Sequence, residues 1–158
     1  MGYEISFEEN AGDEEIQILA DGIIEYTRLK IGPGQGVPLT FFVRDDEGAV
    51  GGGVHGNYSS RSGWLYVRVL WVSDRVRGSG YGTRLMEHIE REAIARGCTD
   101  AYLDTFSFQA PEFYKRLGYV VFGELEDFPV GHSRIFLRKR LKPSAGQPVH
   151  TTNQPGQD

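Results

Sequence analysis

The sequence of 158 residues has little cysteine, no long apolar run and no surplus of basic residues. Its single cysteine, Cys98, excludes a disulfide within the chain, so a domain of this size must rely on an apolar core. No apolar run approaches the roughly 20 residues that a membrane-spanning helix needs. The first residues, MGYEISFEEN, lack the basic head and apolar body of a signal peptide. We therefore expect a cytoplasmic protein that does not bind a membrane.

The charge balance is acidic, with 17 Lys and Arg against 22 Asp and Glu and a formal net charge of −5. Nucleic-acid binding needs basic side chains gathered on one face, so this balance argues against a nucleic-acid partner. Residues 61–100 nevertheless carry seven arginines against five acidic residues, whereas Glu124, Glu126 and Asp127 crowd one short segment. The sequence thus predicts a local cationic site and a separate acidic segment.

Apolar periodicity, broken by glycine and proline, divides the chain into helices and strands. We expect helices over residues 14–29, 81–96 and 110–117, and strands over residues 3–7, 39–44, 49–58, 64–72, 101–105, 119–125 and 133–141. Residues 32–38, rich in glycine and proline, should form an exposed loop. The strand 64–72 is apolar at nearly every position, which predicts that both of its faces are covered.

The most distinctive segment is the run RVRGSGYGT at residues 75–83, between the apolar strand and an amphipathic helix. Glycines let a backbone approach a ligand closely, and amides at a helix N-terminus attract anions. Arg75 and Arg77 add guanidinium groups that can bind phosphate oxygens. A Walker-type loop would end in Gly-Lys-Ser/Thr, and a dinucleotide fold would place its glycine turn after the first strand. Neither pattern is met, so the segment favours a phosphate site of a different kind.

Two motifs in this order resemble those of the GNAT superfamily of acetyl-CoA-dependent N-acetyltransferases. Arg77, Gly80 and Gly82 match its Gln/Arg-x-x-Gly-x-Gly/Ala signature, and APEFYKRLGY at residues 110–119 is similar to its Ala-x-x-Phe-Tyr-x-x-x-Gly-Phe/Tyr block. The resemblance covers about residues 3–141 and implies an α+β fold, with a mixed, mostly antiparallel sheet flanked by helices. It implies a single domain over residues 1–141, followed by a disordered tail over residues 142–158, which offer almost nothing to bury.

The resemblance also implies acetyl transfer from acetyl-CoA to a primary amine in a ternary complex. The residues that it implies for binding acetyl-CoA are Leu70, Trp71, Val72, Arg75, Arg77, Gly78, Ser79, Gly80, Tyr81, Gly82, Thr83, Ser107 and Tyr114. Tyr114 is also expected to protonate the departing thiolate, because a phenol with a pKa of about 10 stays protonated at neutral pH. No metal is expected, since the His, Cys and acidic residues show no metal-ligand spacing.

The resemblance leaves open which group accepts the proton of the amine. Some family members carry a glutamate where this chain has Tyr66, and a family asparagine is replaced by Ser107. Candidates for this role lie in the acidic segment, where Glu124, Glu126 or Asp127 is expected to attract a cationic amine and His132 to accept its proton. Asp104 is a further candidate. The alternative interpretation of that segment is a solvated turn.

The acidic segment and the compact chain favour a small cationic amine, such as a metabolite or an antibiotic, as the acceptor. Two other functions remain: a protein or peptide N-acetyltransferase, and a CoA-binding regulatory module without turnover. The second is motivated by Tyr66 and Ser107, which replace residues that are often functional. Whether the chain forms a homodimer is left open.

Overall fold

The computed structural model describes residues 2–142, so the predicted tail lies outside the described residues except for Lys142. The described chain falls into two compact units, one ending at Gly34 and the other beginning at Gln35. The single domain expected over residues 1–141 stays a prediction.

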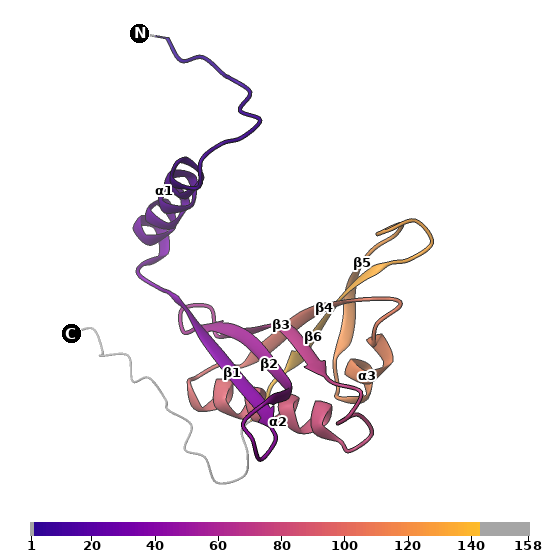
Figure 1. The fold of residues 1–158 in the computed structure, drawn as a ribbon. Helices are drawn as coiled ribbons and strands as arrows, with labels where there is room; N and C mark the ends of the chain where they lie inside the picture. Colours follow the sequence, from indigo (N-terminus) through magenta and orange to yellow (C-terminus); the bar gives the residue numbers. More distant parts are fainter. Residues whose placement is uncertain (1, 143–158) are drawn as a thin grey trace, which may run out of the picture. The chain divides into compact units, whose positions relative to one another are not determined.

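The first unit contains one helix, α1 (Asp13–Ile31) (Figure 1). Three acidic residues occupy its first turn, whereas Arg28 and Lys30 occupy its last turn, which complements the helix dipole. The strand expected over residues 3–7 is wrong: these residues form no regular structure. Tyr3 and Ile5 are fully exposed, and an alternating segment forms a strand only where a neighbouring strand pairs with it.

The second unit is built on a six-stranded sheet with the order β1-β2-β3-β4-β6-β5 (Figure 1). Its elements are β1 (Gly36–Arg44), β2 (Val50–Ser59), β3 (Trp64–Val72), α2 (Tyr81–Ala95), β4 (Asp100–Phe106), α3 (Pro111–Arg116), β5 (Val120–Leu125) and β6 (Arg134–Arg140). Among the described strands, only β3 and β4 pair in parallel, with α2 as the connection between them. The prediction of a mixed, mostly antiparallel sheet flanked by helices is confirmed.

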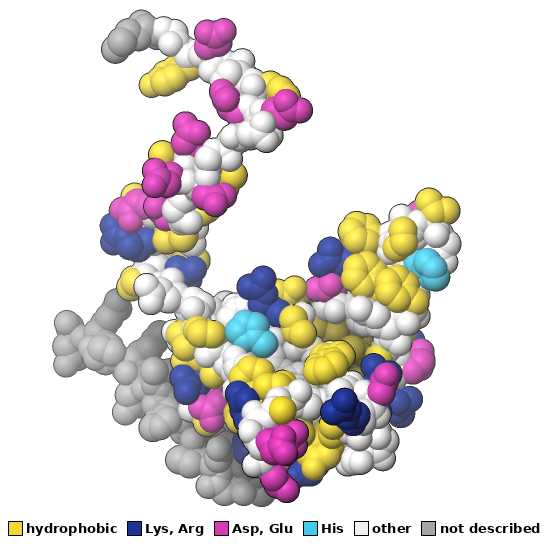
Figure 2. All heavy atoms as spheres, in the orientation of Figure 1, with side chains coloured by type: hydrophobic (Ala, Val, Ile, Leu, Met, Phe, Trp, Pro, Cys, Tyr) yellow, Lys and Arg dark blue, Asp and Glu magenta, His cyan; other side chains and the backbone are white. Residues whose placement is uncertain are grey.

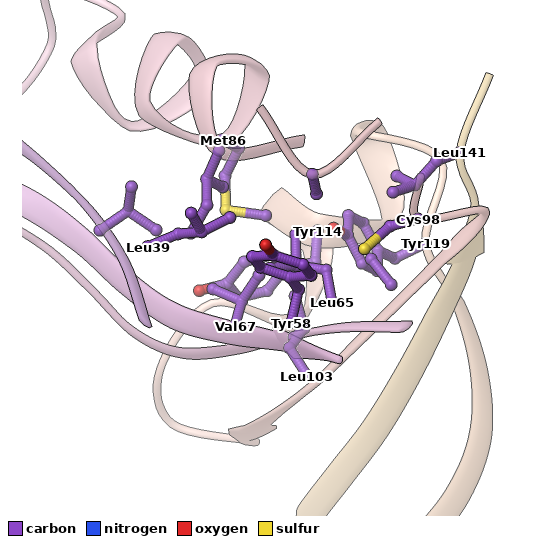
Figure 3. Close-up of a cluster of buried hydrophobic side chains, with 14 of the residues drawn as sticks. Leu39, Tyr58, Leu65, Val67, Met86, Cys98, Leu103, Tyr114, Tyr119 and Leu141 are labelled. Carbon is purple, nitrogen blue, oxygen red and sulfur yellow. The ribbon is translucent and has the colours of Figure 1, made fainter. Parts of the chain in front are cut away.

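The core forms where the apolar stripe of α2 meets one face of the sheet. Leu85, Met86, Ile89 and Ala93 are buried at helical spacing, and Figure 3 shows Met86 extending from α2 toward side chains of the strands. Full burial of a leucine, isoleucine or methionine side chain stabilises the folded state by about 1.5–3 kcal/mol. Burial in this core also raises the pKa of the Cys98 thiol, as expected for a cysteine that packs as a small apolar residue.

The exposed loop expected over residues 32–38 is shorter than predicted, because β1 already begins at Gly36 and includes Pro38. β1 is an edge strand that pairs only with β2. Proline lacks the amide proton that a ladder uses, but an edge strand tolerates it because one side of the strand has no partner.

A β-bulge interrupts the pairing of β2 with β3. His55 pairs with Val69 and Gly56 pairs with Val67, so that Arg68 is the extra residue. A Cβ on Gly56 would collide with the backbone oxygen of Tyr66, which explains the glycine at this position.

The bulge overturns the predicted burial of both faces of β3. A strict alternation would keep Val69 and Trp71 on the core face that Val67 occupies, but the extra residue reverses the alternation beyond Arg68. Leu70 and Val72 pack against the core instead, whereas Val69 and Trp71 are 56% and 51% exposed. The second face of β3 is therefore partly open.

Candidate active site

The sheet splits between its two parallel strands. The ladder between β3 and β4 runs from Trp64 opposite Asp100 to Val67 opposite Leu103 and then ends, although both strands continue. A cleft of about 1010 Å³ opens at the split. The described residues that line it are Arg68, Val69, Leu70, Trp71, Val72, Val76, Arg77, Gly78, Gly80, Tyr81, Gly82, Thr83, Asp104, Thr105, Phe108, Gln109, Ala110, Phe113, Tyr114 and Arg116.

The end of β3 forms one wall of this cleft. Residues Val69 to Val72 pair with β2 on one side, but the β4 side of this segment has no ladder partner among the described strands. Backbone groups need hydrogen-bond partners, so an extended ligand can pair with this open edge as a strand would. The amides that face the cleft can also stabilise negative charge on a carbonyl oxygen.

The glycine turn forms the next part of the cleft. Gly78 and Gly80 have φ angles of 81° and 77°, in the left-handed region that favours glycine. A Cβ at either position would have no atom within 4 Å, so the backbone conformation and not crowding requires glycine. Gly80 caps α2 without a side-chain hydrogen bond, which leaves the first amides of the helix available to an anion.

The arginines of the turn differ in their positions. Arg77 lines the cleft, where its Nε donates to the carbonyl oxygen of Val72 at 3.1 Å and its Nη1 contacts Asp74 at 3.0 Å. These contacts use only part of the five guanidinium N–H groups, so Arg77 can still bind a phosphate. Arg75 is exposed and lies outside the lining of the cleft.

Sequence reasoning missed two further cationic residues of the cleft, Arg68 and Arg116. Arg68 is the only charged residue in the apolar strand β3, which is the signal that could have selected it. Arg116 ends the short helix α3, where a basic residue also complements the helix dipole and therefore carries no distinct signal.

Eleven of the residues expected from the sequence meet in the cleft: Leu70, Trp71, Val72, Arg77, Gly78, Gly80, Tyr81, Gly82, Thr83, Asp104 and Tyr114. Five others do not line it: Arg75, Ser79, Ser107, Glu124 and His132. The glycine turn, the end of β3 and the tyrosine of α3 thus form one continuous surface.

Tyr114 extends from α3 into the core, where it is 9% exposed and packs among the residues in Figure 3. Its ring meets Phe113 and Tyr119 edge to face, with ring centroids 5.1 and 6.1 Å away. Burial raises the pKa of Tyr114 to about 12, and the negative charge of Asp104 adds to this effect. The phenol therefore keeps its proton at neutral pH, and Tyr114 is among the residues that line the cleft.

Asp104 lies one residue beyond the part of β4 that pairs with β3, although it still pairs with Phe136 of β6. It is the only acidic side chain among the described residues that line the cleft. Its Oδ1 accepts a hydrogen bond from the hydroxyl of Tyr66 at 3.0 Å, and its Oδ2 accepts one from Nε of Arg134 at 2.8 Å. Partial burial raises the pKa of Tyr66, as does its bond to Asp104. These two donors fix the carboxylate at the split in the sheet.

Ser107, Glu124 and His132 have other surroundings. Ser107 joins two loops, since its amide donates to the oxygen of Ser133 at 2.8 Å and its Oγ accepts from the amide of Ser133 at 2.9 Å. Glu124 is exposed on β5, an edge strand of the sheet. His132 is exposed in the connection between β5 and β6, where its ring packs edge to face on Phe108 with centroids 5.1 Å apart.

The described residues contain no group of three or more His, Cys, Asp or Glu side chains arranged to hold a metal ion. No helix among them is long and apolar enough to cross a membrane.

Comparison with known proteins is consistent with this geometry. Residues 38–121, more than half of the chain, match the family model described as an acetyltransferase (GNAT) domain. An acetyltransferase of Agrobacterium fabrum is 34% identical over 83% of this chain and 94% of its own length. The blasticidin-S acetyltransferase of Streptomyces morookaense is 37% identical over 61% of this chain and 70% of its own length. The crystal structure of an acetyltransferase from Bacillus cereus superposes with a TM-score of 0.75 and 38% identity, covering 86% of this chain and 98% of that chain.

Proposed function

Since this chain belongs to the GNAT acetyltransferase family, we propose that it moves the acetyl group of acetyl-CoA to a primary amine of a small molecule. The observation that carries the proposal is the split between β3 and β4, which brings the glycine turn, Tyr114 and Asp104 to one cleft. Each of these groups meets one chemical need of the reaction, and the two substrates can meet there in a ternary complex.

The donor end is formed by the glycine turn and the open edge of β3. Amides of the first turn of α2 and the guanidinium of Arg77 suit the pyrophosphate of acetyl-CoA. Arg68 and Arg116 add positive charge along the same cleft. The free backbone edge from Val69 to Val72 can pair with the amide groups of the pantetheine arm and polarise the thioester carbonyl.

In the transfer, the amine nitrogen bonds to the thioester carbonyl carbon, the carbon–sulfur bond breaks, and an amide and a thiol result. An alkylammonium with a pKa of about 10.4 must first lose a proton. Among the candidate proton acceptors, Asp104 lines the cleft. Glu124 and His132 do not line it. We therefore assign to Asp104 the roles of attracting the ammonium and accepting its proton, which then passes to solvent.

Tyr114 completes the proton balance by giving its phenolic proton to the departing sulfur. The second proton that the nitrogen loses after attack replaces the phenolic proton through water, so that the enzyme returns to its starting state. The raised pKa of Tyr114 keeps the phenol protonated before each turnover.

Asp104 is the one carboxylate among the described residues that line the cleft, and it suits an acceptor with a single ammonium group. The name of the Streptomyces relative supports an antibiotic-like or metabolite-like amine. The test is release of CoA thiol from acetyl-CoA by the purified protein, measured across a panel of small amines, peptides and proteins. Turnover with small amines supports the proposal. Turnover with peptides or proteins alone identifies a protein-modifying enzyme, and binding of acetyl-CoA without any turnover identifies a regulatory module.

A further inference from the structure

An exposed phenylalanine lines the cleft that also contains Asp104. Phe108, in the connection between β4 and α3, lines the cleft and is 57% exposed. Asp104, four residues earlier in the chain, lines the same cleft. A large apolar side chain that is exposed in the same cleft as a fixed carboxylate suits a ligand that is both apolar and cationic.

The ring of Phe108 packs against other aromatic side chains. Phe106 stacks on it with ring centroids 5.2 Å apart and an angle of 14° between the planes. His132 meets it edge to face, and Phe128 stacks on Phe106 with centroids 5.9 Å apart. With the rings of Phe106 and His132 in contact, Phe108 is still 57% exposed, so part of its side chain remains open to a ligand.

The backbone that carries Phe108 is fixed by several hydrogen bonds. The amide of Gln109 donates to the oxygen of Phe106 at 2.8 Å, and Oε1 of Gln109 accepts from the amide of Phe106 at 3.1 Å. The paired bonds between Ser107 and Ser133 join this connection to the loop between β5 and β6. The ring is thus held in place before a ligand binds, which lowers the entropic cost of stacking on it.

The loop between β5 and β6 contributes aromatic side chains that pack near Phe108, but none of its acidic side chains lines the cleft. Glu124, Glu126 and Asp127 are all exposed and do not line the cleft, and Oδ1 of Asp127 accepts from the amide of Gly131 within the turn. Figure 2 shows hydrophobic side chains gathered over the outer part of the hairpin formed by β5 and β6. Among the described residues that line the cleft, the carboxylate available to a cationic acceptor is that of Asp104, which the acceptor would share with Arg134.

We propose that Phe108 is a specificity-determining residue whose exposed ring stacks on a planar, unsaturated ring of the acceptor, while Asp104 binds the ammonium group of the same molecule. The inference rests on the proposed function and specifies its acceptor: a primary amine joined by a short linker to an aromatic or heteroaromatic ring. Aromatic stacking that exceeds simple burial corresponds to a preference of about threefold to tenfold for a flat ring over a saturated ring of equal size.

The experiment compares 2-phenylethylamine with 2-cyclohexylethylamine, which have the same linker and ring size but differ in planarity. We measure kcat/KM for each amine by release of CoA thiol, and the Kd of each amine by calorimetry on the full-length protein saturated with CoA. The variants are Phe108→Leu, which removes the flat face, and Phe108→Tyr, which keeps it. Phe122→Leu is the matched control, because Phe122 is 53% exposed on β5 and does not line the cleft.

The expected result is a threefold to tenfold preference for the flat ring that is lost in Phe108→Leu and kept in Phe108→Tyr and Phe122→Leu, with an unchanged KM for acetyl-CoA. Turnover of both amines without preference, or a preference that survives Phe108→Leu, overturns the inference and leaves the proposed function intact. No turnover of either amine, but binding preference that depends on Phe108, overturns the proposed function and leaves the ring site intact. Neither turnover nor preferential binding overturns both.

Discussion

The phenolic hydroxyl of Tyr66, in the paired part of β3, donates a hydrogen bond to Oδ1 of Asp104 on the parallel strand β4 at 3.0 Å. Tyr66 occupies the position where some family members carry a glutamate, and its side chain is directed at the carboxylate of the neighbouring strand. Stacking on Tyr102, with ring centroids 4.6 Å apart, fixes the phenol from the other side. A carboxylate is therefore present near the expected place, but it is supplied by β4.

This arrangement predicts that Asp104→Asn lowers kcat by about a hundredfold, because loss of a positioned proton acceptor typically costs 10²–10⁴ in rate. Steady-state kinetics with the best amine of the panel measure the effect. Glu124→Gln and His132→Gln serve as competing variants, and both should keep kcat within about twofold. A large loss in either of them, with Asp104→Asn active, would return the role to the acidic segment.

Tyr114→Phe should lower kcat by tenfold or more and change the KM for acetyl-CoA by less than about twofold, because it removes only the proton donated to sulfur. Tyr58→Phe is a matched control: Tyr58 is also 9% exposed in the core, lies outside the cleft, and its hydroxyl contacts Arg96. Equal effects of the two substitutions on kcat would show that Tyr114 is only a packing residue.

Arg77→Ala should raise the KM for acetyl-CoA by about tenfold with a smaller effect on kcat, since it removes charge-assisted contacts to phosphate from the cleft. Arg75→Ala is the matched control. Arg75 and Arg77 flank the same residue, but only Arg77 lines the cleft. The structure predicts a KM within about twofold of wild type for Arg75→Ala. Similar KM increases in both variants would show that the bound substrate reaches beyond the cleft described.

Stability should fall as the pH rises from about 10 to about 12. Burial raises the pKa of Tyr114 to about 12, whereas the unfolded phenol titrates near about 10. In this window the unfolded chain has lost a proton that the folded chain still holds, so the free energy of unfolding decreases by about 1.4 kcal/mol per pH unit for this residue. Urea unfolding at pH 9, 10 and 11 measures the slope, and Tyr114→Phe should make it shallower. An unchanged slope in the variant contradicts the prediction.

Tyr119→Phe should destabilise the fold by about 1–3 kcal/mol at neutral pH, measured as a shift of the urea midpoint. Tyr119 is 2% exposed and donates to Oε1 of the buried Glu90 at 2.8 Å, while Lys139 contacts Oε2 at 2.8 Å. The substitution leaves one oxygen of a buried carboxylate without its donor. Tyr3→Phe, at a fully exposed tyrosine, should change stability by less than about 0.5 kcal/mol.

Much of the second unit could be predicted from the sequence because its signals are local. The spacing of Leu85, Met86, Ile89 and Ala93 determined the helix α2, and the expected strand over residues 64–72 has the bounds of β3. The tight turn before α2 could also be predicted, because Gly80 adopts a left-handed φ that favours glycine. Propensity, periodicity and turn chemistry act over a few residues, so a single sequence displays them.

Only the tertiary structure decided which residues share the cleft. The bulge at Arg68 reverses the faces of Val69 and Trp71, and it depends on pairing with a strand ten or more residues away. Asp104 could be selected over Glu124 and His132 only once the separation of β3 from β4 was known. Phe108 carried no sequence signal, because the role proposed for it rests on its place in the cleft and on its contacts with Phe106 and His132. Contacts between distant segments depend on packing, and the sequence of one segment does not record which neighbour it will meet.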